Sequence, residues 1–195
     1  GITLAVQAHE PLRPDSEADR RVALRRDAET NQACYDALRT GVFSYPDRVP
    51  EEIPALAGSS TFVGIQYYTR FRYDGETGGF VLPDVEHRTI SQMAWEVYPE
   101  GLPPLLRRAA ETGLRVYVTE NGICCDDDRT RVEYIADHLA AVDDARRAGA
   151  DVRGYFYWSA MDNFEWNFGY GPKFGLVEVD RATLERRPRP SARFF

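Results

Sequence analysis

Four short runs rich in apolar, β-branched and aromatic residues recur along the chain and predict the strands of a sheet. Between them, apolar residues repeat at helical spacing, an alternation typical of βα units around a parallel sheet. Both faces of the runs are apolar, which indicates strands covered on two sides. The predicted strands span residues 1–7, 61–69, 114–119 and 151–159.

Three longer segments between these runs predict helices, and each one is stopped by a glycine. An aspartate-serine pair caps the first helix. The helices and their stops are residues 17–40 with Gly41, residues 102–112 with Gly113, and a helix with apolar residues from Val132 to Val142 that ends at Gly149. Two segments rich in proline, glycine and acidic residues predict loops, residues 46–54 and 73–83.

Four βα units fit either the start of a doubly wound sheet or half of an eight-stranded barrel. A whole (β/α)8 barrel typically takes about 250 residues, so a chain of 195 residues is too short for one. Half a barrel would leave two strand edges open for pairing. The number of units alone does not decide between the two architectures.

Composition narrows the class of protein. A hydrophobic content of 43% and an aromatic content of 12% are those of one globular domain and argue against disorder. A net charge of −7 without a basic cluster argues against a nucleic-acid partner. No apolar run reaches the roughly 18 residues of a membrane span, so we expect no membrane partner.

Cysteine and histidine usage predicts neither a disulfide framework nor a metal site. The three cysteines, Cys34, Cys124 and Cys125, have no paired spacing, and the reduced cytoplasm is the default location. His87 and His138 have no ligand partner at metal spacing, so we expect no metal and no cofactor. The chain starts at a glycine, so a removed leader would not be visible.

Polar residues follow three of the predicted strands, where active residues of parallel sheets gather. Glu120 comes directly after the third strand, and its carboxylate would project into the mouth of the sheet; a capping or loop glutamate is the alternative. The tryptophans fall on the same predicted side, beside carboxylates and amides. Stacking rings and hydroxyl-binding groups together are typical of sugar recognition. These tryptophans are Trp95, Trp158 and Trp166.

Several blocks together resemble the second half of a family 1 glycoside hydrolase, the β-glucosidase family. They are VYVTENGIC, GYFYWSAMDNFEWNFGYGPKFGLVEVD, GIQYYT, AWEVYPEGL, the opening HEPLRPDSEADRRVA and the tail RRPRPSARFF. The similarity runs in order over essentially the whole chain. It implies an α/β fold, a (β/α)8 TIM barrel of which residues 1–195 form about the C-terminal half as one domain.

The resemblance also implies roles for individual residues. Glu120 would be the catalytic nucleophile, with Tyr68 hydrogen-bonded to it and keeping it ionised. Trp158 would form a stacking floor for the sugar. Glu165 would bind two sugar hydroxyls, and the indole N–H of Trp166 would donate to a third. Phe174 would line the same sugar subsite, and Trp95 would line the entrance where the leaving group sits.

The chain departs from the family pattern at positions that bear on catalysis and sugar binding. The family's acid/base glutamate lies in an Asn-Glu-Pro motif that does not occur here, and Glu10-Pro11 follows His9 instead of asparagine, so Glu10 is not assigned that role. Gln66 replaces the usual asparagine before the tyrosine pair, and Lys173 and Ala160 are further departures. Because Glu165 is retained, the resemblance favours an unphosphorylated sugar over a 6-phosphorylated one.

We therefore expect a retaining β-glycosidase that removes terminal non-reducing β-D-glucosyl residues through a covalent glycosyl-enzyme. The substrate would be a small β-glycoside or oligosaccharide. The missing acid/base implies that the isolated chain is poorly active and needs an N-terminal half-barrel, in cis or in trans. The alternatives are a sugar-binding pseudoenzyme half-barrel that acts with a partner chain, and another barrel hydrolase sharing only a strand-end glutamate.

Overall fold

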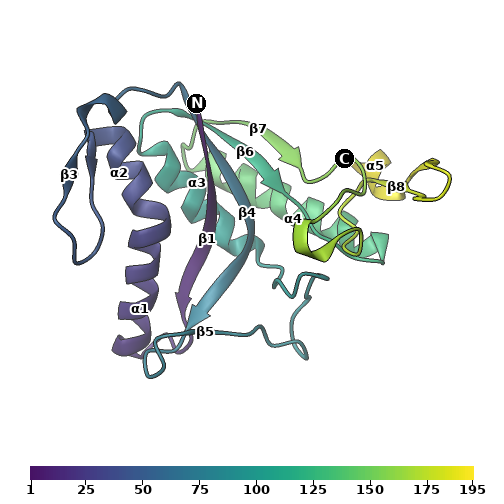
Figure 1. Cartoon of the computed structure of the whole chain (residues 1–195), viewed down its shortest axis with the longest axis horizontal. Coiled ribbons are helices and arrows are strands. Elements are labelled where there is room, and N and C mark those ends of the chain that lie inside the picture. The colour runs from purple at the N-terminus through teal and green to yellow at the C-terminus, as the bar shows by residue number, and fades with distance from the viewer.

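The computed structural model describes all 195 residues and is built on a twisted parallel sheet. Its four long strands follow the order β1-β4-β6-β7 and run in the same direction (Figure 1). All four predicted strands are confirmed. Their bounds are β1 Ile2–Pro11, β4 Phe62–Tyr73, β6 Arg115–Asn121 and β7 Val152–Tyr157.

Helices follow the strands as predicted, and the first predicted helix contains a π turn. Ser16 caps it by accepting a bond from the backbone N–H of Asp19, and Gly41 ends it with a φ of 76°. No helix combines the length and the apolar character that crossing a membrane requires. The helices are α1 Glu17–Asp27, the π turn η1 Ala28–Gln32, α2 Ala33–Thr40, α3 Leu102–Ala110, α4 Asp128–Arg147 and α5 Pro190–Phe194.

The structure corrects two expectations about the segments between these elements. The first strand continues to Pro11, because parallel pairing with β4 persists as far as Tyr73 after the apolar pattern has ended. The two predicted loops contain short elements. The minor elements are β2 Val42–Phe43, β3 Glu51–Glu52, η2 Pro54–Leu56, β5 Phe80–Val81, η3 Pro99–Gly101, η4 Trp166–Phe168, β8 Val177–Val179 and β9 Arg186–Pro188.

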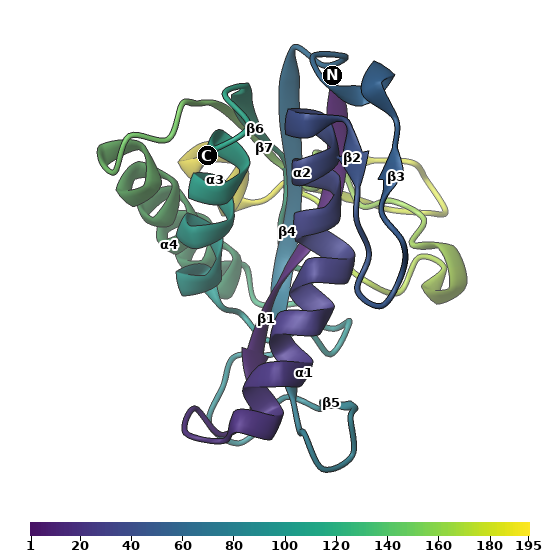
Figure 2. The ribbon, with the colours of Figure 1, turned by 90° about the vertical axis from the view of Figure 1, so that its left-hand side faces the viewer.

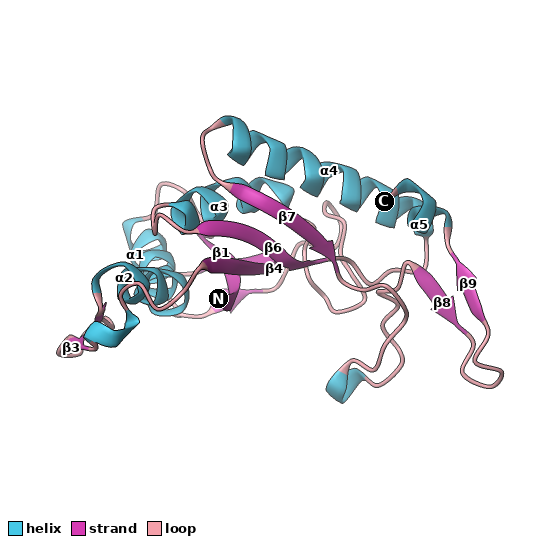
Figure 3. Ribbon diagram, turned by 90° about the horizontal axis from the view of Figure 1, so that it is seen from above, coloured by secondary structure: helices cyan, strands magenta, loops and turns pink.

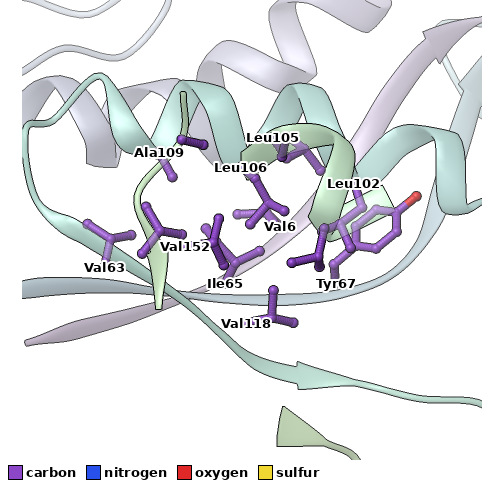
Figure 4. Close-up of a cluster of buried hydrophobic side chains, with 14 of the residues drawn as sticks. Val6, Val63, Ile65, Tyr67, Leu102, Leu105, Leu106, Ala109, Val118 and Val152 are labelled. Atoms are coloured by element: carbon purple, nitrogen blue, oxygen red, sulfur yellow. The ribbon is translucent and has the colours of Figure 1, made fainter. Parts of the chain in front are cut away.

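Figures 2 and 3 show the helices on one face of the sheet. The hydrophobic core is formed by side chains of the strands and of these helices. Val63, Ile65 and Tyr67 alternate along β4 and are fully buried. Figure 4 shows them packed with side chains of α3, including Leu102 and Leu106. This packing fixes which face of each strand points toward the helices.

The opposite face of the sheet has no layer of helices. Phe62 alternates with the buried residues of β4, and its ring meets Tyr117 of β6 edge-on, 5.4 Å away. Phe156 of β7 is 58% exposed. Within these 195 residues helices therefore cover the strands on one face only, which corrects the expectation of cover on both. The outer edges of β1 and β7 are also unpaired.

Candidate active site

Glu120 lies at the carboxyl end of β6 with both carboxylate oxygens hydrogen-bonded. Oε1 accepts a bond from Nε2 of Gln66 at 2.8 Å, and Oε2 accepts a bond from the hydroxyl of Tyr68 at 2.7 Å. Gln66 and Tyr68 are two residues apart on β4, so their side chains point to the same face. The longer glutamine at position 66 thus reaches the carboxylate directly.

A register shift between β4 and β6 sets the direction of Glu120. Ile65 pairs with Val118, yet the next residue, Gln66, pairs with Glu120. Thr119 is the extra residue of a bulge, which bends a strand and redirects the side chains that follow. Strict alternation from the buried Val118 would have turned Glu120 toward the helices. The bulge instead places it on the face of Gln66.

Tyr68 is suited to donate to this carboxylate. Burial, together with the hydrogen bond to Glu120, raises the pKa of Tyr68 well above its usual value near 10. Its hydroxyl therefore stays protonated at neutral pH and can act as a donor. Both groups that bond to Glu120 are hydrogen-bond donors. They suit a carboxylate anion, which can only accept hydrogen bonds.

Two aromatic side chains converge on Tyr68 from distant parts of the chain. The ring of Trp95 lies 5.2 Å from the Tyr68 ring, and the ring of Phe174 lies 6.2 Å from it. Phe174 is almost fully buried, whereas Trp95 is partly exposed. The structure thus gathers five of the predicted site residues, Glu120, Gln66, Tyr68, Trp95 and Phe174, into one cluster.

A second cluster follows β7. The indole nitrogen of Trp158 donates to Oε1 of Glu165 at 3.1 Å, and the side-chain amide of Asn163 donates to the same oxygen. Oε2 of Glu165 has no partner in the chain and is not enclosed. The backbone N–H of Trp158 donates to the carbonyl of Asn121 at 2.9 Å, which joins the two clusters through neighbouring strand ends.

The structure does not bring Trp166 against the other site residues. Its side chain is 82% exposed and makes no hydrogen bond or ring contact within the chain. It lies in the turn η4, in a left-handed backbone conformation with a φ of 48°. The indole is therefore presented to solvent on the same loop as Glu165.

Asn121, the residue after Glu120, was missed by the sequence analysis as a site residue. It is fully buried, and its amide donates to the Tyr67 carbonyl at 2.7 Å and to the Tyr134 hydroxyl at 2.9 Å. Its oxygen accepts a bond from the hydroxyl of Tyr155 at 2.6 Å. One side chain thus ties the end of β6 to β4, α4 and β7. The asparagine is visible in sequence, but its three partners are not.

Beneath this asparagine lies an uncharged layer. His138 stacks on the ring of Tyr134, with ring centroids 3.8 Å apart, and its Nδ1 bonds to the Tyr134 carbonyl. Burial lowers the pKa of His138 to about 4. The imidazole is therefore neutral at physiological pH.

The loop that carries Glu165 is held by an ion pair. Both oxygens of Asp162 accept bonds from the guanidinium of Arg189, at 3.0 and 2.9 Å. Burial opposes ionisation of this carboxyl, but the Arg189 bonds hold the pKa of Asp162 below its usual value. Asp162 also accepts a bond from the backbone of Gly175. The C-terminal segment thus fixes the start of the loop.

Glu10 does not join either cluster. Its oxygens are taken by Arg70, at 2.7 Å, and by the hydroxyl of Tyr98, at 2.7 Å. Glu10 thus belongs to a separate group of charged and aromatic side chains. No group of three or more histidine, cysteine or acidic side chains is arranged to hold a metal ion.

Comparison with known proteins places this arrangement in a family. The model of glycosyl hydrolase family 1 matches residues 1–195, the whole chain. The chain belongs to glycosyl hydrolase family 1. Among curated family 1 relatives, it is 34% identical to a β-glucosidase of Agrobacterium sp. over all of this chain and 48% of the relative. It is 30% identical to a 6-phospho-β-galactosidase of Staphylococcus haemolyticus over all of this chain and 53% of that relative.

Solved structures of family 1 enzymes share the fold. A β-glycosidase from Pyrococcus horikoshii superposes with a TM-score of 0.86 and 42% identity, over 98% of this chain and 46% of that one. A β-glucosidase from Thermotoga maritima in complex with glucoimidazole gives a TM-score of 0.84 and 28% identity, over 97% of this chain and 48% of that one. The chain spans about half the length of these relatives. Its parallel sheet and helices are part of a (β/α)8 TIM barrel, as predicted.

Proposed function

We propose that this chain is part of a retaining β-glycosidase in which Glu120 is the nucleophile. The observation that carries the proposal is the carboxylate of Glu120, held at a strand end by one donor on each oxygen. A nucleophile must meet the anomeric carbon in one orientation, and two donors on separate oxygens fix that orientation. The substrate would be a small β-glycoside or oligosaccharide with a terminal β-D-glucosyl residue.

In the proposed reaction, Glu120 attacks the anomeric carbon and forms a covalent glycosyl-enzyme, which water then hydrolyses. A retaining glycosidase also needs a carboxylic acid about 5–5.5 Å from the nucleophile to protonate the leaving oxygen. Glu10 is engaged by Arg70 and Tyr98, so we place the general acid outside these 195 residues. General acid catalysis is worth roughly 10²–10⁴-fold in rate, so we expect the isolated chain to be poorly active.

The rest of the barrel would supply that acid from an N-terminal half, in cis or in trans. The uncovered sheet face, with Phe156 58% exposed, and the unpaired edges of β1 and β7 support this proposal. Exposed apolar surface and open strand edges favour association with a complementary half.

The second cluster would bind the sugar. The unpaired Oε2 of Glu165 can accept a bond from a sugar hydroxyl, and Trp158 offers a ring on which the pyranose can stack. The exposed indole of Trp166 can donate to a further hydroxyl. Trp95 would wall the site, with the buried ring of Phe174 packed against it. We favour an unphosphorylated sugar, because a 6-phosphate would be repelled by the Glu165 carboxylate.

The proposal is tested by completing the barrel. The N-terminal part of the Pyrococcus horikoshii β-glycosidase, 42% identical over the shared part, can be fused ahead of residue 1. The fusion is then treated with a 2-deoxy-2-fluoro-β-glucoside, and the labelled peptide is mapped by mass spectrometry. We expect the label on Glu120. A label on another carboxylate would overturn the assignment.

Two further measurements separate the alternatives. Robust turnover of cellobiose by the purified 195-residue chain would contradict the need for an acid from outside. Binding of glucose-like ligands by the fusion, with neither label nor turnover, would instead favour the sugar-binding pseudoenzyme.

A further inference from the structure

Arg70 is a buried arginine shared by two carboxylates. Its side chain is 8% exposed, and its Nε and Nη2 donate to the two oxygens of Glu96 at 3.0 and 2.8 Å. Its Nη1 donates to Glu10 at 2.7 Å. The side chain of Glu96 is only 2% exposed. Such a two-point contact fixes direction as well as distance.

Neighbouring residues of β4 hold the same loop. The hydroxyl of Thr69 donates to the backbone carbonyl of Glu96 at 3.0 Å. The hydroxyl of Tyr67 donates to the backbone carbonyl of Tyr98. The Tyr98 ring in turn stacks against the Arg70 guanidinium, 4.0 Å from its centroid. The end of β4 therefore grips the segment 96–98 through several independent contacts.

Arg70 and Glu96 are each close in sequence to an aromatic residue of the candidate active site. Arg70 comes two residues after Tyr68, and Glu96 comes directly after Trp95. The rings of Tyr68 and Trp95 lie 5.2 Å apart, and Tyr68 donates to Glu120. Any movement of Glu96 away from Arg70 would shift Trp95 relative to Tyr68.

We propose that Arg70 is a positioning residue that, through Glu96, holds the Trp95 ring in place on the leaving-group side of the site. This inference rests on the proposed function, because it takes Trp95 to line the space for the leaving group. Arg70 itself touches neither substrate nor nucleophile. Its substitution should therefore affect substrates according to the size of their leaving group.

The first test uses the 195-residue chain and needs no activity. Arg70→Met removes the two-point contact, and Arg88→Met is the matched control, because Arg88 is 50% exposed and lies 3.4 Å from the same carboxylate. We expect amide hydrogen exchange in residues 89–98 to quicken by roughly tenfold or more in the first variant and to change little in the second. Exchange in β6 and β7 should stay as in the parent chain. Uniform quickening over the whole sheet would show a merely structural arginine and overturn the proposal.

A milder variant covers the case in which Arg70→Met does not fold, since unpairing a buried carboxylate is strongly destabilising. Arg70→Lys keeps the charge but cannot reproduce the two-point contact. It should quicken exchange in residues 89–98 alone, by a smaller factor. No local change in this variant would contradict the proposal.

The second test uses the completed barrel and two leaving groups. With cellobiose, whose leaving group is a sugar, we expect Arg70→Lys to lower kcat/KM by roughly tenfold or more. With β-glucosyl fluoride, whose leaving group is a single atom, the loss should stay within about twofold. Equal losses with both substrates would overturn the proposal. If the parent fusion is inactive, the proposed function fails, and the exchange result decides the role of Arg70.

Discussion

The carboxylate at the end of β6 and the carboxylate after β7 are held in different ways. Glu120 has one donor on each oxygen, from Gln66 and Tyr68. Glu165 receives both of its donors, from Trp158 and Asn163, on the same oxygen, and its second oxygen has no partner. A carboxylate fixed at both oxygens is suited to attack along one line. A carboxylate with one free oxygen is suited to accept a bond from a ligand.

The layers beneath the two carboxylates differ as well. Below Glu120, the buried Asn121, Tyr134 and His138 form an uncharged support. The loop of Glu165 is held by the ion pair of Asp162 with Arg189. Glu120 is thus supported by buried neutral groups, whereas the loop of Glu165 is anchored by charge.

The largest effect is expected from Glu120→Gln, which replaces the carboxylate held at both oxygens with an amide. The amide cannot form the glycosyl-enzyme, so kcat of the completed barrel should fall by roughly 10⁴-fold or more. Steady-state rates with cellobiose measure this loss, and the unchanged circular dichroism of the variant is the control. A loss of less than tenfold would mean that the attack comes from another group.

The next largest effect is expected from Tyr68→Phe, which removes the donor on Oε2 of Glu120 and leaves the ring packing intact. Preorganised donors at reacting oxygens are worth roughly 10²–10³-fold in kcat. We expect a loss of that size in kcat/KM, with kcat falling more than KM changes. The matched variant Tyr73→Phe removes a hydroxyl that bonds His9, away from both clusters, and should be nearly silent. Equal losses in the two variants would contradict a specific role for Tyr68.

Sequence reasoning succeeded where local patterns determine the outcome. The apolar runs predicted four strands, and the strand-end rule placed Glu120 at the carboxyl end of its strand. It failed where contacts distant in sequence decide the outcome. The bulge at Thr119, which turns Glu120 to the face of Gln66, depends on pairing between two strands and has no local signal.

The sequence also did not predict the contacts that loop residues make with distant parts of the chain. Arg70 and Glu96 are 26 residues apart in the chain, so no spacing rule relates them. The same holds for Asp162 and Arg189, which are 27 residues apart. The exposure of Trp166 follows from the conformation of its loop, which composition does not specify, and its contact with a sugar stays a prediction.

The neutral layer below Glu120 and the ion pair below Glu165 should respond differently to pH, and the free energy of unfolding measures the response. His138 takes a proton near pH 6.5 when unfolded but only near pH 4 when folded, because burial lowers its pKa to about 4. Between these values the unfolded chain binds more protons. The free energy of unfolding should therefore fall by up to about 3 kcal/mol as the pH drops from 6.5 to 4. The bonds from Arg189 hold the pKa of Asp162 below its usual value, so this pair should contribute little to the fall.

Urea unfolding of the 195-residue chain at a series of pH values measures this effect. His138→Phe keeps a ring against Tyr134 and should flatten the slope over this range. His87→Asn changes a histidine that is 75% exposed and should leave the slope unchanged. The same slope in the parent chain and in His138→Phe would show that other groups govern it.

The smallest effect is expected at the second carboxylate. In Glu165→Gln the side-chain oxygen can still accept bonds from Trp158 and Asn163, while the position of the free oxygen carries an amide donor instead. A sugar hydroxyl would lose a charged acceptor, which is worth about 1.5–3 kcal/mol, so kcat/KM should fall by roughly 10–100-fold. Labelling by the 2-fluoro glycoside should persist at a reduced rate, because Glu120 is untouched. Complete loss of labelling would mean that Glu165 takes part in the attack itself, and the contrast between a fixed and a half-free carboxylate would not describe their roles.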